Sequence, residues 1–472
     1  MDKSSRFAHS FPASTLREYD IRGIVGETLH PADAFAIGRT FGSIVARNGG
    51  TRVAAGRDGR LSSPELAAAL IDGLVASGMA VTDIGCGPTP MLYFAATTGA
   101  TDGAVMVTGS HNPANYNGFK MMLGRKPFFG AQILELGRLS AAGDVVAEAK
   151  GSVAAKDVSD AYIARLLQDW DGGDRSLDVV WDSGNGSAGD ILGRLVKSLP
   201  GRHTILNGEI DGRFPAHHPD PTVPRNLEQL VAEVRKRRAD IGIAFDGDAD
   251  RIGIVDDTGE ILFGDQFLIL LARDVLAAKP GETIIADVKA SQVLFDQISA
   301  AGGKPLMWKT GHSLIKAKMA ETGAPLAGEM SGHIFFADRW YGFDDALYAA
   351  IRVLNAVIAS GESVSAFRKS LPQVLNTPEL RFDCPEDRKF AVVSEVAERL
   401  RADGAKVSET DGVRVSTEDG WWLLRASNTQ AVLVARAEAG SDTGLARLKA
   451  TLAAQLAASG LAPDFSGANA GH

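Results

Sequence analysis

Short runs of β-branched and apolar residues alternate along the chain with longer stretches whose apolar positions recur at helical spacing. The run at residues 51–57 reads as a strand and ends in a glycine-rich turn. The stretch at 62–78 then places Leu66, Leu70 and Leu74 on one helical face. This alternation predicts an α/β protein in which layered sheets are flanked by helices.

The same rhythm of strand, turn and helix recurs at five further segments, residues 103–111, 178–186, 241–251, 283–291 and 305–313. No fixed repeat length accompanies it, but it suggests three similar α/β units. After Leu371 the strands become shorter and a single amphipathic helix follows, which predicts a smaller α+β domain. We therefore expect four domains, at residues 1–155, 156–259, 260–372 and 373–472.

Composition narrows the class of protein. The 472 residues are 45% hydrophobic and 23% charged, as in ordinary globular proteins, which excludes a disordered or fibrous chain. A net charge of −9 argues against binding to nucleic acid or to anionic membranes. The most apolar stretch, beginning at Phe267, is interrupted by Arg273 and Asp274, and no signal-peptide pattern opens the chain. With only two cysteines, the chain is expected in the cytoplasm.

Four loops carry chemically capable side chains, and the first spans residues 108–120. Ser110 stands where a strand ends, and Gly109 allows the backbone to turn tightly, so the hydroxyl can be presented to a cleft. His111 is adjacent, and Lys120 can return to the same place. The alternative is a polar turn that hydrogen-bonds only with itself.

The second loop has the sequence FDGDADR and carries Asp246, Asp248 and Asp250. Three carboxylates at alternate positions repel one another unless a positive charge neutralises them. Oxygen ligands of this kind suit Mg²⁺ bound beside a phosphate. A calcium loop of the EF-hand type needs glycine where Arg251 stands. The alternative is an acidic surface turn, but the pattern favours a metal site.

The third loop, GEMSGH, offers hydrogen-bond acceptors, a donor and a titratable ring, which suit sugar hydroxyls. Its polar members are Glu329, Ser331 and His333. The fourth loop, RASNTQ, combines a guanidinium with hydroxyl, amide and backbone donors that suit a phosphate. Its members are Arg425, Ser427, Asn428 and Thr429. Taken singly, either loop is equally compatible with an ordinary polar turn.

A fifth segment points to a different function. Gly184, Gly186 and Gly189 have the GxGxxG spacing of dinucleotide-binding folds, and Glu209 stands 20 residues further on. The pattern is short, however, and arises readily in tight turns between a strand and a helix. Nicotinamide binding would also leave the four loops unexplained. We therefore interpret this segment as a tight turn.

Together the motifs resemble those of the α-D-phosphohexomutase family nearly from end to end. REYDIRG from Arg17, GRDGRLSSP from Gly56 and GPTPM from Gly87 resemble its first-domain signatures. The four loops resemble, in order, its phosphoserine, metal, sugar and phosphate loops. Met330 favours the bacterial phosphomannomutase/phosphoglucomutase branch, because phosphoglucosamine mutases more often have glutamine there. One departure is Gln430, where the family often has glutamate.

The resemblance implies three related α/β domains with mixed sheets and a smaller C-terminal α+β domain around a central cleft. It implies a phosphohexomutase that interconverts the 1-phosphates and 6-phosphates of mannose or glucose. The reaction would pass through a phosphorylated Ser110 and a hexose 1,6-bisphosphate, with glucose 1,6-bisphosphate as intermediate and activator. One Mg²⁺ per chain would be held by Ser110, Asp246, Asp248 and Asp250. The partners would be small hexose phosphates, and the protein would be a monomer.

Further roles follow from the matching motif positions. The implied catalytic residues are Ser110, His111, Lys120, Arg22, Arg251 and Lys289. The implied substrate-binding residues are Tyr19, Lys289, His312, Glu329, Met330, Ser331, Gly332, His333, Arg425, Ser427, Asn428 and Thr429. A lysine can act as general base if burial or neighbouring cations lower its pKa. The choice among the basic side chains around Ser110 stays open.

Three other functions share parts of this pattern. A phosphoglucosamine mutase would use the same chemistry on another sugar and would act on glucosamine 6-phosphate. A metal-dependent sugar phosphatase would release phosphate steadily from glucose 1-phosphate, but it has no need of a second phosphate-binding loop. A non-catalytic sensor of sugar phosphates would keep its function after replacement of Ser110 by alanine.

Overall fold

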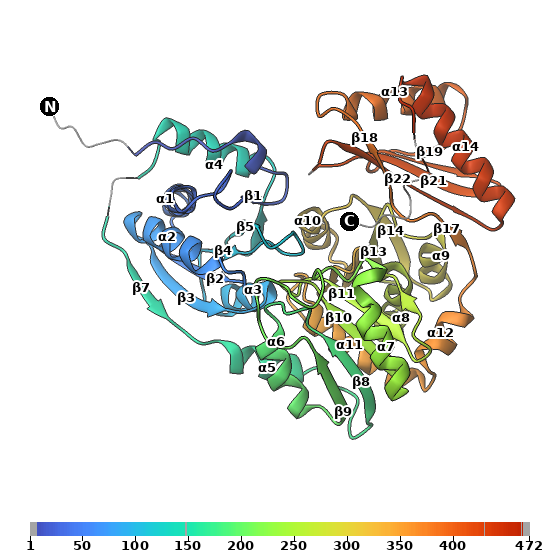
Figure 1. Ribbon diagram of the computed structural model, residues 1–472, viewed down its shortest axis with the longest axis horizontal. Helices are drawn as coiled ribbons and strands as arrows, with labels where there is room; N and C mark the ends of the chain where they lie inside the picture. Colours follow the sequence, from blue (N-terminus) through green and yellow to red (C-terminus); the bar gives the residue numbers. More distant parts are fainter. Residues whose placement is uncertain (1–6, 147–148, 429, 464, 466–472) are drawn as a thin grey trace.

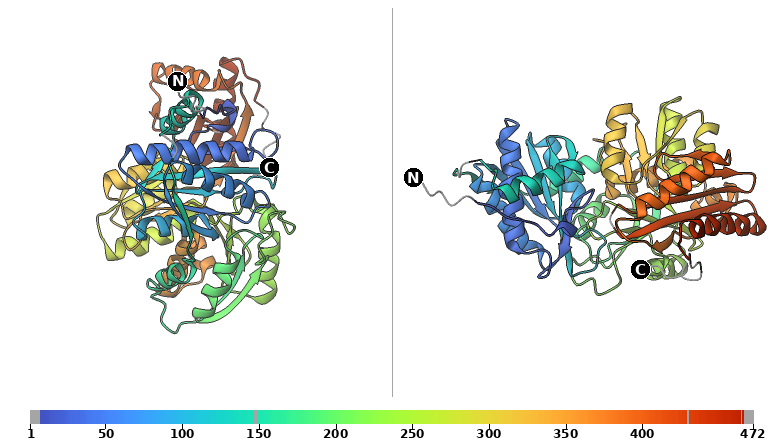
Figure 2. Two further views of the ribbon diagram at one scale, coloured as in Figure 1. Left: turned by 90° about the vertical axis from the view of Figure 1, so that its left-hand side faces the viewer. Right: turned by 90° about the horizontal axis from the view of Figure 1, so that it is seen from above.

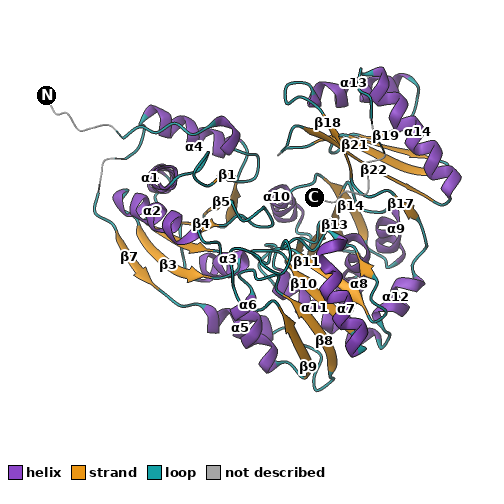
Figure 3. Ribbon diagram, in the orientation of Figure 1, coloured by secondary structure: helices purple, strands orange, loops and turns teal. Residues whose placement is uncertain are grey.

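The computed structural model describes residues 7–146, 149–428, 430–463 and 465. Four β-sheets follow one another along the chain, each with its own helices (Figures 1 and 3). The first and last of these domains lie on opposite sides of the molecule (Figure 2). The predicted fold class, three α/β domains with mixed sheets and a C-terminal α+β domain, is confirmed.

The first domain contains a seven-stranded mixed sheet in the order β1-β5-β4-β2-β3-β7, with β6 beside β5. Its strands are β1 Ile21–Ile24, β2 Arg52–Arg57, β3 Ala80–Cys86, β4 Gly103–Val107, β5 Tyr116–Leu123, β6 Lys126–Phe128 and β7 Ser152–Ala155. Its helices are α1 Pro31–Arg47, α2 Ser63–Ala76, α3 Thr89–Thr98 and α4 Ala131–Ala142, preceded by a 3₁₀ turn at Ala13–Thr15.

Helices α1 and α2 pack with their backbones in contact. A Cβ atom added at Gly38 would lie 2.1 Å from the carbonyl oxygen of Leu70. A Cβ atom added at Gly73 would lie 2.2 Å from the carbonyl oxygen of Phe35. Glycine at both positions therefore permits a close helix crossing, and Leu70 of the predicted helical face is buried in the core.

The second domain contains a five-stranded sheet in the order β12-β11-β10-β8-β9. Its strands are β8 Leu177–Asp182, β9 Gly201–Leu206, β10 Ile241–Phe245, β11 Ile252–Asp256 and β12 Ile261–Leu262. Its helices are α5 Ser159–Leu167, α6 Gly189–Leu195 and α7 Glu228–Arg237, with 3₁₀ turns at Val196–Ser198 and Pro224–Leu227. Strands β10 and β11 are buried along their whole length.

The third domain contains a four-stranded sheet in the order β14-β13-β15-β16. Its strands are β13 Thr283–Asp287, β14 Lys304–Trp308, β15 Leu326–Gly328 and β16 Ile334–Phe336. Its helices are α8 Gly264–Ala278, α9 Gln292–Ala300, α10 His312–Thr322, α11 Ala346–Ser360 and α12 Val364–Ser370. Helix α11 is largely buried because it packs against α5 of the second domain as well as α8.

The C-terminal domain contains an antiparallel sheet in the order β17-β22-β21-β20-β19, with β18 also beside β22. Its strands are β17 Leu375–Asn376, β18 Leu380–Asp383, β19 Lys406–Ser408, β20 Val413–Thr417, β21 Gly420–Ala426 and β22 Val432–Ala439. Its helices are α13 Lys389–Ala402 and α14 Asp442–Ala458.

The C-terminal sheet docks on the third domain through a buried arginine. Nη1 of Arg414 donates to the carbonyl oxygens of Val288 at 2.7 Å and Ala290 at 2.9 Å. Its guanidinium also lies 3.6 Å from the ring centre of Trp421. Burial lowers the pKa of Arg414 to about 10. The segment around Lys289 is thus attached to the C-terminal domain.

The four predicted loops occupy one topological position. Each joins a strand to the antiparallel neighbour that follows it in the chain: β4 to β5, β10 to β11, β15 to β16 and β21 to β22. In the first three domains the leading strand also pairs in parallel on its other side. The polar residues therefore begin where a buried strand ends.

None of the described helices is by itself long and apolar enough to cross a membrane. The bent pair formed by α11 and α12 meets that requirement only jointly, by length and composition.

Candidate active site

The turn after β4 directs Ser110 toward the loop after β10. Ser110 has a φ of 49°, in the left-handed region, and its side chain is buried. Its Oγ donates to Oδ2 of Asp246 over 2.9 Å and lies 3.2 Å from Nδ1 of His111. Burial, together with the Arg251 and Arg22 cations, lowers the pKa of His111 well below its usual value. The imidazole beside the hydroxyl is therefore neutral at pH 7.

The loop after β10 gathers three carboxylates. Asp246, Asp248 and Asp250 are fully buried, and each offers an oxygen within 4.8 Å of the others. Oδ1 of Asp246 accepts hydrogen bonds from the backbone N–H groups of Asp250 at 3.1 Å and Arg251 at 3.2 Å. Ala249, with a φ of 55°, makes the tight turn that brings the carboxylates together.

Lys120 of β5 reaches the same carboxylates. Its Nζ lies 2.7 Å from Oδ2 of Asp248 and also contacts Asp250. Burial opposes the charge, but these two carboxylates raise the pKa of Lys120 well above its usual value. Burial and the other two carboxylates raise the pKa of Asp246 well above its usual range. In this arrangement Lys120 is a cation and neutralises part of the acidic cluster.

The carboxylate cluster fits a divalent metal ion. Within the part of the chain that the structure describes, Oδ1 of Asp248 and Oδ1 of Asp250 are buried and have no hydrogen-bond partner, so two lone-pair sites remain for an ion. The donors are hard carboxylate oxygens with the Ser110 hydroxyl beside them, a set that suits Mg²⁺ better than softer metals.

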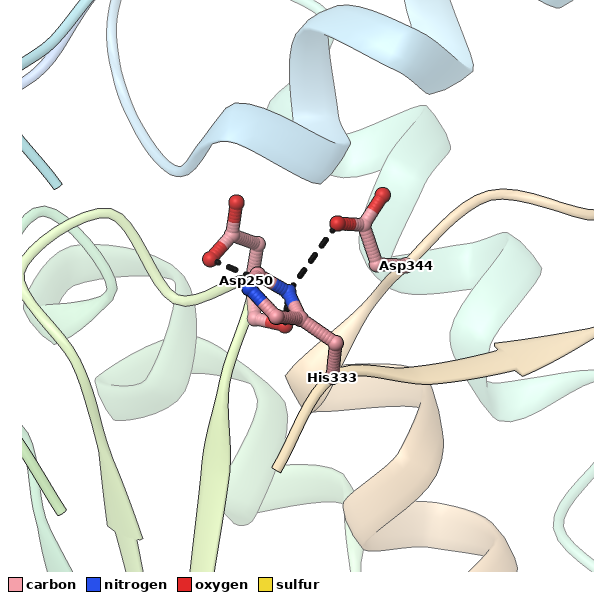
Figure 4. A group of neighbouring side chains, drawn as sticks. All are labelled: Asp250, His333 and Asp344. Carbon is pink, nitrogen blue, oxygen red and sulfur yellow. Dashed lines mark hydrogen bonds and ion pairs between the residues drawn. The ribbon is translucent and has the colours of Figure 1, made fainter. Parts of the chain in front are cut away.

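His333 links the metal loop to the sugar loop (Figure 4). Its Nδ1 lies 3.1 Å from the carbonyl oxygen of Asp250 and 3.1 Å from Oδ2 of Asp344. Its Nε2 accepts a hydrogen bond from Nε of Arg251 at 3.0 Å. His333 of the sugar loop is therefore bonded directly to the metal loop.

The remaining residues of the sugar loop are held from several sides. Oε1 of the buried Glu329 accepts from the backbone N–H of Gly311 at 2.6 Å. The backbone N–H of Met330 donates to Asp287 at 3.2 Å. Gly332 has a φ of 88°, and a Cβ there would lie 2.3 Å from a backbone oxygen of β11. Ser331 is half-buried.

Two further basic side chains of the third domain approach the site. Nζ of Lys289 lies 3.1 Å from Oε2 of Glu379 in the C-terminal domain. Burial acts against it, but Lys289 and Arg381 lower the pKa of Glu379 to about 2. His312, at the start of α10, lies 3.7 Å from Asp344, and burial lowers the pKa of His312 well below its usual value.

The phosphate loop meets the first and third domains. Asn428 donates to the hydroxyl of Tyr19 at 2.7 Å, and that hydroxyl donates to the carbonyl oxygen of Thr310 at 2.9 Å. Nε of Arg425 donates to Oδ2 of Asp411 at 2.9 Å. Ser427, two residues after Arg425, is buried, and its N–H donates to the carbonyl oxygen of Val432 in β22. Thr429 lies outside the described residues.

Arg22 completes the surroundings of Ser110. Its Nη1 lies 3.4 Å from the carbonyl oxygen of Gly109 and also contacts Asn112, while Nη2 contacts Asp20. Sequence reasoning gave no role to several side chains that touch the predicted ones. They are Arg60, Thr89, Asp287, Asp344, Glu379 and Asp411. Asp58 and Arg60 lie within GRDGRLSSP, which resembles a first-domain signature of the family, so the sequence did carry a signal for them.

The GxGxxG segment joins β8 to α6 and supports the metal loop. The N–H and Oγ of Ser187 donate to the carbonyl oxygen of Gly247 at 2.9 and 3.1 Å. A Cβ at Gly186 would lie 2.9 Å from that same oxygen. The glycines therefore let this turn approach the metal loop, as a tight turn between a strand and a helix allows.

Comparison with known proteins identifies the family. Four domain signatures match in order: phosphoglucomutase/phosphomannomutase alpha/beta/alpha domain I at residues 13–133, domain II at 160–259, domain III at 263–375 and the C-terminal domain at 379–455. The chain belongs to the phosphoglucomutase/phosphomannomutase family. The predicted family and enzyme class are confirmed.

Individual relatives agree with this assignment. A phosphomannomutase/phosphoglucomutase of Pseudomonas putida is 45% identical over 95% of this chain and 96% of its own. A phosphoglucomutase of Neisseria gonorrhoeae is 45% identical over 93% and 96%. A crystal structure of a family protein from Burkholderia thailandensis matches with a TM-score of 0.91 at 44% identity, over 96% and 99%. The fold also matches an Aspergillus fumigatus N-acetylphosphoglucosamine mutase solved with GlcNAc-6P and magnesium, with a TM-score of 0.58 at 14% identity over 93% and 95%.

Proposed function

We propose that the chain interconverts hexose 1-phosphate and hexose 6-phosphate, with mannose or glucose as the sugar, through a phosphorylated Ser110. The phosphoryl group passes from Oγ of Ser110 to the free hydroxyl of the bound sugar phosphate. The resulting hexose 1,6-bisphosphate turns over within the cleft and returns its other phosphoryl group to Ser110. The observation that carries the proposal is the 2.9 Å contact between Ser110 and Asp246 in a buried cluster of three carboxylates.

One Mg²⁺ per chain would be held by Asp246, Asp248, Asp250 and an oxygen on Ser110. When bound, such an ion neutralises negative charge and stabilises it on the transferring group. The two unpartnered carboxylate oxygens and the magnesium-containing structure of the distant fungal mutase support this choice.

The chain's own cations would stabilise the same transfer. Lys120 and Arg22 flank the Ser110 turn, and Arg251 bridges the metal loop to His333. His111 would orient the phosphoserine. The hydroxyl proton of the sugar must pass to a basic side chain or to solvent. Among the candidates Lys289 and His312 lie outside the carboxylate cluster, whereas Lys120 lies within it and carries a raised pKa.

Both ends of the sugar phosphate must be held in turn, because the bisphosphate presents either phosphate to Ser110. We assign the distal phosphate to the C-terminal loop, which contains Arg425, Ser427, Asn428 and Thr429. We assign the sugar to residues of the first and third domains, Tyr19, Lys289, His312, Glu329, Met330, Ser331, Gly332 and His333. Glu329 and Ser331 would bind hydroxyls that occupy equivalent places in both orientations.

The test is a coupled assay of the purified chain with glucose 1-phosphate, mannose 1-phosphate and glucosamine 1-phosphate, each with Mg²⁺ and glucose 1,6-bisphosphate. We expect 6-phosphate formation from the first two, loss of activity with a chelator and no steady phosphate release. Product from glucosamine 1-phosphate alone would identify a phosphoglucosamine mutase, and steady phosphate release a phosphatase. We also expect a cytoplasmic monomer, which gel filtration and cell fractionation test.

A further inference from the structure

A single buried guanidinium lies beneath the Ser110 turn. Nη2 of Arg60 donates to the carbonyl oxygens of Ser110 at 2.8 Å and Asn112 at 2.6 Å. Nη1 donates to the carbonyl oxygens of Pro113 at 2.6 Å and Tyr116 at 3.1 Å. Arg60 is 1% exposed, so these donors are not used by solvent. One side chain thus binds four backbone acceptors of the loop that carries the proposed phosphoserine.

Arg60 is itself held in place. Its Nε lies 3.2 Å from Oδ2 of Asp58, and that oxygen also accepts from the backbone N–H of Gly109 at 3.0 Å. Oδ1 of Asp58 accepts from the hydroxyl of Ser63 and from the N–H of Arg60. The ring of Phe214 covers the guanidinium at 5.0 Å. A planar group with several fixed donors fits this task, whereas an ammonium does not.

The turn needs such support for two reasons. Ser110 is a non-glycine residue at a φ of 49°, a conformation that persists only where its surroundings enforce it. Its carbonyl oxygen also packs against the metal loop, since a Cβ at Gly247 would lie 2.4 Å from it. A Cβ at Gly109 would lie 2.3 Å from Nε of Arg60. The glycines at both positions therefore allow the turn, the guanidinium and the metal loop to meet.

We infer that Arg60 is a positioning residue for phosphoryl transfer: it holds the Ser110 turn in its left-handed conformation, with Oγ directed at the carboxylate cluster. This inference rests on the proposed phosphoserine role of Ser110. Arg60, in the loop after β2, acts through the carbonyl oxygens of Ser110 and its neighbours, while Arg22 reaches the turn from β1. Loss of Arg60 therefore acts first on the turn that carries the reacting oxygen.

The experiment compares the full-length wild type with Arg60→Lys, Arg60→Ala and the control Arg352→Lys. Arg352 is also 1% exposed, but it pairs with Asp338 and Asp274 away from the site. For each chain we measure the thermal midpoint, phosphorylation of Ser110 by glucose 1,6-bisphosphate, and kcat and KM with glucose 1-phosphate. Arg60→Ala is also assayed with guanidinium chloride at a sub-denaturing concentration. Arg60→Lys keeps a buried cation, so its kcat and KM test the inference even if the alanine variant does not fold.

We expect kcat of Arg60→Lys to fall about 100-fold, as for a reacting group displaced by roughly 1 Å. KM should change less than about twofold, and guanidinium should restore part of the kcat of Arg60→Ala. Arg352→Lys should lower the thermal midpoint with kcat unchanged. An unchanged kcat in Arg60→Lys, or an equal loss in Arg352→Lys, overturns the inference while leaving the proposed function intact. A wild type that never gains phosphate at Ser110 overturns the proposed function, and this inference with it.

Discussion

Nζ of Lys120 lies 2.7 Å from Oδ2 of Asp248, although the two residues belong to different domains. The lysine ends among the three carboxylates of the metal loop, where its ammonium compensates part of their charge. A metal ion bound there would share these oxygens with Lys120. The affinity for the ion therefore depends on how many of the three aspartates are ionised and on how strongly Lys120 competes for their oxygens.

Replacement of Asp248 by asparagine tests the metal site. The change removes one ionised oxygen ligand, so we expect the affinity for Mg²⁺ to fall at least about 10-fold. Calorimetric titration with magnesium chloride measures it. Asp296→Asn, at an exposed carboxylate of α9, is the matched control and should bind like the wild type. Equal affinities for Asp248→Asn and the control would place the ion elsewhere.

Tyr19→Phe tests the contact among the first, third and C-terminal domains. The hydroxyl accepts from Asn428 and donates to Thr310, so its loss removes two hydrogen bonds worth about 1 kcal/mol each. We expect KM for glucose 1-phosphate to rise up to roughly 30-fold with a smaller change in kcat, because the phosphate loop docks less often. Steady-state kinetics measure both constants. Tyr341→Phe, on the surface of the third domain, is the control, and an unchanged KM in Tyr19→Phe would refute the role.

Arg425→Lys tests the phosphate loop. Asp411 holds Nε of Arg425, and among the described residues no hydrogen bond occupies its two terminal nitrogens, which suit a bidentate contact with a phosphate. Lysine cannot make that contact, so we expect KM to rise roughly 10- to 100-fold, as for a lost charge-assisted bond of about 1.5–3 kcal/mol. The control is Arg447→Lys, at an exposed arginine of the same domain. If both variants have the wild-type KM, the distal phosphate binds at another place.

Asp345 makes stability depend on pH. Its carboxylate accepts from the N–H of Tyr348 at 2.9 Å and from the hydroxyl of Tyr162 at 2.8 Å. Burial raises the pKa of Asp345 from 3.8 to about 7. The folded chain therefore binds this proton more tightly than the unfolded chain, and its contribution to stability decreases as pH rises from about 4 to 7.

Asp345→Asn removes this dependence, because an amide resembles the protonated acid. We compare the free energy of unfolding of the variant with that of the wild type at each pH. The difference, variant minus wild type, should be about 1–3 kcal/mol larger at pH 8 than at pH 5. Urea unfolding at both pH values measures the difference. A variant whose advantage is equal at pH 5 and pH 8 would show that Asp345 does not titrate in this range.

The sequence predicted those parts of the site that are local in the chain. Three aspartates at alternate positions after a buried strand indicate a metal loop, and the structure does bring Asp246, Asp248 and Asp250 together. Ser110 was identified because a glycine and a polar turn follow a buried strand. Each of the four loops joins two antiparallel neighbours, and the order of strands and turns already suggests related domains.

Contacts between domains could not be predicted. Glu379 lies 90 residues from Lys289 in the chain and stands in no recognisable motif, so its pairing depends on how the C-terminal domain docks. Nothing in the sequence assigned Asp344 to the site, and its contact with His333 is known only from the structure. Sequence reasoning also considered a lowered pKa for a catalytic lysine, whereas buried carboxylates raise that of Lys120. The residue-level domain boundaries and the roles of the site residues stay predictions.

The most direct test of the account is the intact mass of the purified chain before and after incubation with glucose 1,6-bisphosphate, with the modified peptide sequenced. We predict one added phosphoryl group on Ser110, which disappears when mannose 1-phosphate or glucose 1-phosphate is added. Ser110→Ala should gain no phosphoryl group and lose nearly all activity while keeping its fold. Phosphorylation at another residue, or none under any condition, would contradict the phosphoserine mechanism.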